Sequence, residues 1–405
     1  MAYLGNTEYR RKKKKRTLKL FVFISAVCLC IAGWMIAEGL AFLRSQELPD
    51  RLPEETLPEG PSAPELPGAA FSAAEPAEPS AAYRHFESAL SGEEWKQYIE
   101  IREAIASAVP GIEFKTGNLE RLMELAVQIH QDYPEYFWFS GKVHTSYREL
   151  FSSYSGTLFF SYDFPASEIE GRQAELEAAS RPLLSRLSGK SDYEKVKGVY
   201  EELINSTAYQ KGEYDQTCYS VLVNHRGVCA GYAAAMKYLL DRLGVDSIIV
   251  SGTSKGEDHA WNIVKVQGEW YQTDVTWGDP VMNNGLPFLS YDYLLLDDAE
   301  MLEDHQPDPQ QTYPVCSSET YNYFKAEGLY LEECSAEELL RILQLCKSRN
   351  TDFIFKCADR FLYAEVKDYL FEKQNVFTLL KRAGVSAESI DYYTDDDHRS
   401  IYIRL

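Results

Sequence analysis

The stretch RGVCAGYAAAMKYLLDRLG, residues 226–244, places a cysteine at the start of a predicted helix. The run after Cys229 is rich in alanine and apolar on one side, and it ends at Gly244, a residue type that commonly terminates helices. A helix N-terminus carries partial positive charge and free backbone amides, and both lower the pKa of a thiol there. Cys229 is therefore a candidate nucleophile, and the small residues Ala230 and Gly231 would let a substrate backbone come close.

Three short strands are predicted after this helix, at residues 246–251, 259–266 and 269–275. The dipeptide Gln267-Gly268 predicts a tight hairpin turn between the last two strands. If the turn is centred on this dipeptide, Trp261 faces Asp274 and His259 faces Thr276. Side chains alternate along a strand, so Asp274 lies on the same face as His259, diagonal to it and within reach. A one-residue change in the loop would put the two side chains on opposite faces.

These positions predict a catalytic triad in the order Cys229, His259, Asp274. The carboxylate would orient the imidazole, and the imidazole would take the thiol proton. Each residue also has a structural explanation: a buried cysteine packs as a small hydrophobe, a histidine can be satisfied in a core, and an aspartate can end a strand. The agreement of helix start and hairpin parity favours the catalytic interpretation. Asp258 would point to the other face of its strand and is a weaker partner.

Three segments closely resemble the core of the transglutaminase-like superfamily, in particular its bacterial secreted or membrane-anchored branch: residues 226–232, 258–264 and 270–277. The three motifs cover about residues 190–300. The aromatic run at 132–139 resembles the region that often precedes this core, although core packing is its simpler explanation. Gly278 departs from the family pattern, because relatives commonly have an acidic residue there.

The resemblance implies a papain-like α+β fold and supports the triad Cys229, His259 and Asp274. It also suggests that three aromatic residues shape the cleft, with packing as the alternative for each: Tyr232, Trp261 and Trp277. A thiolate that attacks an amide forms a thioester. Water as acceptor then gives hydrolysis or deamidation, and a lysine amine gives an isopeptide bond, so a protein or peptide substrate is expected. The Cys229 backbone N–H is a natural oxyanion donor, and no second donor is assigned.

No cofactor or metal is expected. No set of histidine, cysteine and aspartate has zinc-ligand spacing, and no EF-hand pattern occurs. The cluster Asp395-Asp396-Asp397-His398 is interpreted as a solvated turn. Outside the apolar N-terminal segment six cysteines remain, and their spacing implies no disulfide framework.

The N-terminal end predicts a membrane anchor. Residues 1–19 hold eight basic side chains and one acidic one, and Leu20–Ala37 is a run of 18 uncharged, mostly apolar residues. As a helix this run spans about 27 Å, close to the thickness of a bilayer core. The basic flank predicts a single-pass protein with a cytoplasmic N-terminus and an extracellular globular part. A cleaved signal peptide is the alternative.

The whole chain has 41 basic and 62 acidic residues, a formal net charge of −21, which disfavours a nucleic-acid binder. Hydrophobic residues make up 45%, enough for a sizeable core.

Four Ser-x-x-Glu patterns indicate helix starts: Ser91–Glu94, Ser167–Glu170, Ser191–Glu194 and Ser335–Glu338. Helices are predicted at 92–108, 118–131, 167–187, 192–206, 216–224, 335–348 and 361–383, with further strands at 352–357, 389–394 and 399–404.

Six parts are predicted along the chain: a basic cytoplasmic tail at 1–19, a transmembrane anchor at 20–43, a linker rich in Pro, Glu and Ala at 44–83, an N-terminal α/β region at 84–165, a transglutaminase-like catalytic core at 166–316 and a small C-terminal α/β appendage at 317–405. The predicted function is that of an extracytoplasmic transglutaminase-like cysteine enzyme, a thiol acyltransferase or a cysteine peptidase or amidase. The alternative is a non-catalytic cell-surface peptide-binding or scaffold module with the same fold. The oligomeric state is left open.

Overall fold

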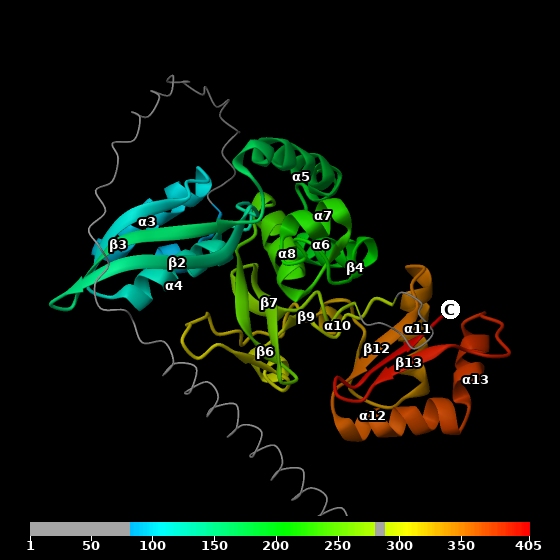
Figure 1. Cartoon of the computed structure of the whole chain (residues 1–405). Coiled ribbons are helices and arrows are strands. Elements are labelled where there is room, and N and C mark those ends of the chain that lie inside the picture. Colours follow the sequence, from blue (N-terminus) through cyan, green and yellow to red (C-terminus); the bar gives the residue numbers. More distant parts are fainter. Residues whose placement is uncertain (1–81, 280–287) are drawn as a thin grey trace, which may run out of the picture. The chain divides into compact units, whose positions relative to one another are not determined.

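The computed structural model describes residues 82–279 and 288–405 (Figure 1). The predicted basic tail, the predicted anchor and nearly all of the predicted linker at 44–83 lie outside these residues. Within the described ranges, no helix combines the length and the apolar character needed to cross a membrane.

The first described part is a three-stranded antiparallel sheet of strand order β1-β3-β2, with helices packed on it. Its elements are α2 (His85–Ala89), α3 (Gly92–Ala106), β1 (Gly111–Thr116), α4 (Leu119–Asp132), β2 (Phe139–Leu150) and β3 (Ser153–Tyr162). Its core joins helix residues such as Ile101 and Leu125 to strand residues such as Phe139 and Leu158. In the aromatic run that precedes β2, Phe137 and Trp138 are buried, so core packing accounts for them.

The second part carries the predicted motifs and contains a five-stranded antiparallel sheet of order β10-β6-β7-β8-β9. Its helices are α5 (Ala166–Leu187), α6 (Asp192–Ser206), α7 (Cys218–Asn224), α8 (Cys229–Arg242) and α9 (Asp298–Met301). Its strands are β4 (Ala208–Tyr209), β5 (Arg226–Gly227), β6 (Ser247–Ser254), β7 (Glu257–Val266), β8 (Glu269–Thr273), β9 (Leu294–Leu296) and β10 (His305–Pro307). Helix α8 packs against β6 and β7, as Figure 1 shows.

Helix α8 begins at Cys229 and is followed by Gly244 in the left-handed region, as the sequence predicts. The prediction that Gly231 lets a substrate come close is wrong. A Cβ at this position would collide with the carbonyl oxygen of Asp215, because the loop before α7 lies directly against the helix there. Gly231 is buried, and it allows the loop and the helix to pack closely.

The predicted hairpin register is confirmed. Val266 pairs with Glu269 across the turn, and the ladder continues to the pair Asn262 and Thr273. Gln267 and Gly268 both have positive φ, which two-residue hairpin turns of this twist require. Strand β8 ends at Thr273, so Asp274 is the first residue beyond the ladder.

The third part is a four-stranded sheet of order β11-β12-β14-β13 with helices. Its elements are α10 (Tyr323–Ala326), β11 (Tyr330–Leu331), α11 (Ala336–Ser348), β12 (Phe353–Cys357), α12 (Arg360–Lys367), the π-helix η1 (Asp368–Glu372), α13 (Asn375–Arg382), β13 (Tyr392–Asp395) and β14 (Ser400–Ile403). The single helix predicted at 361–383 is wrong. Gln374 adopts a left-handed conformation, and this ends the regular backbone before α13 begins.

The second and third parts share one hydrophobic core, which runs from Phe137 to Ile403 in sequence. Strand β14 also bonds to the segment before β9. The Tyr402 hydroxyl accepts the Tyr291 backbone N–H at 3.0 Å, and the Ser400 hydroxyl donates to the buried carboxylate of Asp292 at 2.8 Å. The residues predicted as an appendage are therefore packed into the core that supports the candidate site.

Candidate active site

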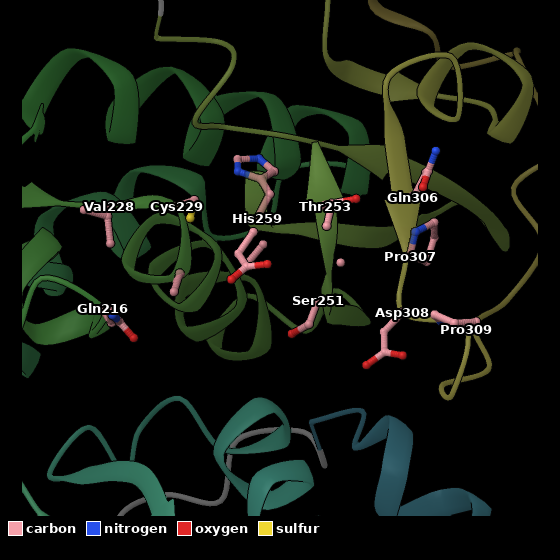
Figure 2. Close-up of a pocket in the computed structure, with 14 residues that line it drawn as sticks. Gln216, Val228, Cys229, Ser251, Thr253, His259, Gln306, Pro307, Asp308 and Pro309 are labelled. Atoms are coloured by element: carbon pink, nitrogen blue, oxygen red, sulfur yellow. The ribbon is translucent and has the colours of Figure 1, made fainter. Parts of the chain in front are cut away.

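Cys229 lies at a pocket of about 740 Å³ and is half-buried. The short parallel pair of β4 and β5 holds the chain just before it, and the Val228 backbone N–H donates to the Asp215 carbonyl at 2.9 Å. These bonds hold the residues before α8, so the thiol is presented at the helix N-terminus. Figure 2 shows Cys229 beside His259, with Ser251, Thr253 and the segment 306–309 on the other side of the pocket.

His259 comes from β7 and lies between the thiol and a carboxylate. Its Nε2 is 2.6 Å from Oδ2 of Asp274. The imidazole also lies next to the Cys229 thiol, and because Nε2 faces Asp274, Nδ1 is the nitrogen left to interact with the thiol. Asn262, three residues further along β7, donates its side-chain amide to the Ala233 carbonyl of α8 at 3.0 Å. This bond fixes the strand that carries the imidazole against the helix that carries the thiol.

Asp274 is fully buried, and hydrogen bonds occupy both of its carboxylate oxygens. Oδ1 accepts the backbone N–H of Thr276 at 2.8 Å and that of Trp277 at 3.2 Å. Oδ2 faces two imidazoles, His259 at 2.6 Å and His305 at 3.1 Å. The structure thus brings together all three residues of the predicted triad, and their catalytic roles remain predictions.

The electrostatics of the cluster favour a thiolate beside an imidazolium. Burial opposes ionisation of the thiol, but the hydrogen bond and charge of His259 hold the pKa of Cys229 below its ordinary value. Burial also disfavours the imidazolium, yet the charge of Asp274 outweighs it and raises the pKa of His259 to about 10. Burial would raise the pKa of Asp274, but the pKa is held well below the usual range, chiefly by His259. A thiol pKa lowered by a neighbouring imidazolium is typical of an activated cysteine.

His305 was not predicted from the sequence. It begins β10, is completely buried and contacts Asp274 from 31 residues away. Its Nδ1 also lies 2.6 Å from Oδ1 of Asp304. No local pattern marks this histidine, because its position depends on β10 pairing with β6 at the edge of the sheet.

Tyr209 and Gln216 were also missed. Gln216 lines the pocket together with Cys229. The Tyr209 hydroxyl is within hydrogen-bonding reach of the Cys229 backbone N–H, the amide that the sequence names as an oxyanion donor. Tyr209 is about half exposed, which leaves it room to move.

The three aromatic residues expected to shape the cleft do not line the pocket. Tyr232 is buried within α8, and its hydroxyl donates to Asp279 at 2.9 Å. Trp261 is buried against the His305 ring, with 4.9 Å between ring centroids, and its indole N–H donates to Gln272 at 2.8 Å. Trp277 is half-buried, with its indole N–H on the Ser254 hydroxyl at 3.0 Å. Packing is therefore the role the structure shows for all three.

Gly278 has a local explanation. A Cβ at this position would collide with the hydroxyl of Tyr200, which is completely buried and donates to the Ser290 carbonyl at 2.7 Å. An acidic residue cannot occupy this position while Tyr200 stays in place.

The ligand atoms of His259, Asp274 and His305 lie within 4.8 Å of one another, a spacing at which such atoms can hold a metal ion. Their separations of 2.6 and 3.1 Å are those of hydrogen bonds, with both imidazoles directed at one carboxylate oxygen. The cluster therefore has the geometry of a hydrogen-bond relay. All six cysteines of the described ranges are free thiols.

Residues 182–275 match the family model described as the transglutaminase-like superfamily. The kyphoscoliosis peptidase of Mus musculus is 28% identical over 173 residues, which cover 37% of this chain and 26% of that protein. The same peptidase of Homo sapiens is 27% identical over 172 residues, with the same coverage. The matched part spans about a quarter of the length of these curated relatives.

A solved structure described as a TGase is also similar. It is 14% identical, covers 33% of this chain and 44% of its own chain, and has a TM-score of 0.25.

Proposed function

We propose that the protein, whose residues 182–275 match the transglutaminase-like superfamily, is a cysteine enzyme that attacks protein or peptide amides through a thioester acyl-enzyme. The observation that carries the proposal is the position of His259 at the pocket, between the Cys229 thiol and the Asp274 carboxylate at 2.6 Å. A non-catalytic binding module would have no need of a buried carboxylate that raises the pKa of an imidazole next to a thiol.

The proposed reaction has two steps. The Cys229 thiolate attacks the amide carbonyl, and the Cys229 backbone N–H stabilises the oxyanion. The carbon–nitrogen bond then breaks, and His259 gives its proton to the leaving nitrogen, so that a thioester and ammonia or an amine result. In the second step His259 takes a proton from water or from an incoming amine. The nucleophile displaces the sulfur and regenerates the thiolate.

The charge of the pocket lining supports an amine as the acceptor. Two carboxylate residues, Asp258 and Asp308, line it together with Cys229. Negative charge attracts a protonated amine such as a lysine side chain. Transfer to an amine is therefore the branch that the pocket chemistry favours over simple hydrolysis.

Alkylation of the full chain tests the nucleophile. Iodoacetamide is applied over a pH series, and each modified cysteine is identified by peptide mass spectrometry. We expect Cys229 to react at least about tenfold faster at neutral pH than Cys334, because a thiolate rather than a thiol is alkylated. Cys334 is the matched internal control, since it is also a half-buried free thiol and its burial raises its pKa. Equal rates for the two cysteines would overturn the proposal.

A labelled primary amine offered with a glutamine-bearing protein then separates the two reaction branches. Incorporation of the label shows transfer, and release of ammonia without incorporation shows hydrolysis or deamidation. The Cys229→Ala chain is the negative control for both products. A reactive Cys229 without incorporated label, released ammonia or cleaved peptide bonds would leave the binding-module alternative in its place.

We also propose that the pocket works outside the cell membrane, with the chain anchored by residues 20–43. The basic block at 1–19 and the uncharged run that follows it support this orientation. A membrane-impermeant maleimide applied to intact cells should label Cys229. Labelling only after the cells are lysed would contradict the proposed orientation.

A further inference from the structure

His305 is a buried imidazole between two carboxylates. Its Nε2 lies 3.1 Å from Oδ2 of Asp274, and its Nδ1 lies 2.6 Å from Oδ1 of Asp304. The side chain has no exposure to solvent, so water cannot satisfy either nitrogen. The mechanism proposed above does not use this residue, although it touches the carboxylate of the predicted triad.

The geometry defines the charge of this imidazole. An ionised carboxylate only accepts hydrogen bonds, so an imidazole nitrogen that faces one must carry a hydrogen. His305 faces a carboxylate with each nitrogen, and it is therefore doubly protonated. Asp304 stays ionised because its other oxygen accepts the Tyr293 hydroxyl at 2.7 Å and lies 3.5 Å from the Lys255 ammonium.

Asp274 is ionised for a similar reason. Its Oδ1 accepts two backbone N–H groups, and the charges and hydrogen bonds of His259 and His305 hold its pKa well below the usual range against the effect of burial. The hydrogen bonds to Asp274 and Asp304 raise the pKa of His305 against the effect of its burial. The cluster thus holds a second positive charge beside His259.

The two imidazoles compete for one oxygen atom. Both direct Nε2 at Oδ2 of Asp274, and their ring centroids are 5.4 Å apart. Like charges at this distance destabilise each other, so a charged His305 makes it easier for His259 to lose its proton. The other groups around the pair are Cys229, which faces His259, and Asp304, Tyr293 and Lys255, which lie on the side of His305.

We propose that His305 is a positioning residue: as a buried imidazolium it holds the Asp274 carboxylate in place and limits the basicity of His259. Its catalytic consequence rests on the proposed function. A general acid gives up its proton more readily as its pKa falls toward the working pH, and an imidazole paired with Asp274 alone would hold the proton for the leaving amine still more tightly. The sharing of Asp274 between two charged imidazoles does not depend on catalysis.

The test measures the pKa of single histidines in the full chain. Exchange of the imidazole Cε1 hydrogen for deuterium depends on protonation and is read peptide by peptide by mass spectrometry. The Cys229→Ala chain is used so that the thiol does not titrate with His259. In this chain His305→Gln keeps a donor toward Asp274 but removes the charge, and it should raise the pKa of His259 by about one unit.

The matched control is His398→Gln. His398 is also buried, lies 3.4 Å from the carboxylate of Asp395 and packs on Tyr293, but it has no contact with Asp274. We expect it to leave the pKa of His259 unchanged. If His305→Gln only made the Asp274 side chain more mobile, the pKa of His259 would fall. A pKa of His259 that falls or stays unchanged in the His305→Gln chain therefore overturns the proposal.

Asp304→Asn provides a second test if His305→Gln does not fold. Asp304 is partly exposed, so the fold should tolerate the change, and the pKa of His305 itself should fall by about one unit or more. The Cε1 hydrogen of His305 is also measured at pH 7 in the chain that retains Asp304. Exchange at the rate of a neutral imidazole there would contradict the proposal.

The failure of this inference is distinguishable from failure of the proposed function. If Cys229 alkylates slowly but His305→Gln raises the pKa of His259, the charge sharing stands and the enzyme proposal falls. If Cys229 is reactive and the pKa of His259 does not rise, only the role of His305 is wrong. In an active enzyme, His305→Gln should slow amide cleavage about tenfold while Cys229 alkylation persists.

Discussion

Asp274 is the residue on which the candidate site depends. Its carboxylate accepts two backbone amides on one oxygen and faces two imidazoles with the other. Burial raises the pKa of Cys229, but the hydrogen-bonding interaction with His259 and the charge of that imidazole lower it by more. At the residue scale, the reactivity of the thiol is therefore set by a carboxylate that the thiol does not touch.

We expect Asp274→Asn to slow Cys229 alkylation at neutral pH by about 10–100-fold and amide cleavage by about 10³–10⁴-fold. The amide removes the charge that raises the pKa of His259, so the imidazolium beside the thiol is lost. The measurement is the pH dependence of alkylation and of ammonia release. Asp246→Asn is the control, because Asp246 does not line the pocket and its carboxylate is paired with Lys265 at 3.6 Å. Equal effects of the two substitutions would refute the assignment of Asp274.

Gly278→Ala should reduce the free energy of unfolding by about 2–3 kcal/mol, because the new methyl group collides with the buried Tyr200 hydroxyl. Gly171→Ala is the matched control. Gly171 lies in α5 with open space around its Cα, and we expect this change to stabilise the chain by about 0.5–1 kcal/mol. Urea unfolding of both variants gives the comparison. Equal stability changes would show that Tyr200 does not restrict this position.

At the element scale, the site forms where α8 meets the hairpin of β7 and β8. The helix presents Cys229 at its N-terminus, and the two-residue turn sets the register that brings Asp274 to the face of His259.

The Ser-x-x-Glu capping patterns were less uniform in their outcome. Ser191 and Glu194 form a reciprocal capping box, whereas Ser167 lies inside α5, which begins at Ala166 after Pro165. A capping pattern is a local signal, and a nearby proline can take its place at the helix start.

Asn262→Ala should weaken the link between β7 and α8. The substitution leaves the Ala233 carbonyl without its side-chain donor, and we expect the free energy of unfolding to fall by about 1–3 kcal/mol. Cys229 alkylation should also slow, since His259 lies on the same strand. Asn205→Ala is the control, because its amide donates to the Glu201 carbonyl on an exposed helix surface. An Asn262→Ala chain with unchanged stability would contradict this role.

On the scale of the whole molecule, the C-terminal residues belong to the structure that supports the site. Strand β14 shares the core with α8, and Tyr402 and Ser400 bond to the segment that precedes β9. This segment in turn holds the site, because the Asp274 backbone N–H donates to the Tyr293 carbonyl at 3.0 Å. The third part of the chain is thus linked to Asp274 through three consecutive residues, Tyr291, Asp292 and Tyr293.

The stability of the folded chain should depend on alkaline pH through His259. A histidine whose folded pKa is raised stabilises the fold below its unfolded pKa of 6.5, and the contribution is lost as the pH rises through the folded value of about 10. In the Cys229→Ala chain the thiol no longer raises the pKa of His259, so the loss should occur at a pH below that value. We expect the free energy of unfolding to fall by about 2 kcal/mol.

Urea unfolding at several pH values measures this loss. Adding His259→Gln to the Cys229→Ala chain should flatten the pH dependence, since the residue that releases the proton is gone. Identical slopes with and without His259 would show that its proton is not linked to folding.

The sequence by itself determined the features that depend on neighbouring residues. The helix start at Cys229, the turn at Gln267-Gly268 and the alternation along β7 are short-range, and together they predicted the triad. The tertiary structure decided the rest. His305 reaches Asp274 only because β10 joins the sheet edge, and the third part shares a core that no local pattern marks. Turn chemistry and periodicity act over a few residues, whereas contacts between distant segments depend on how whole elements pack.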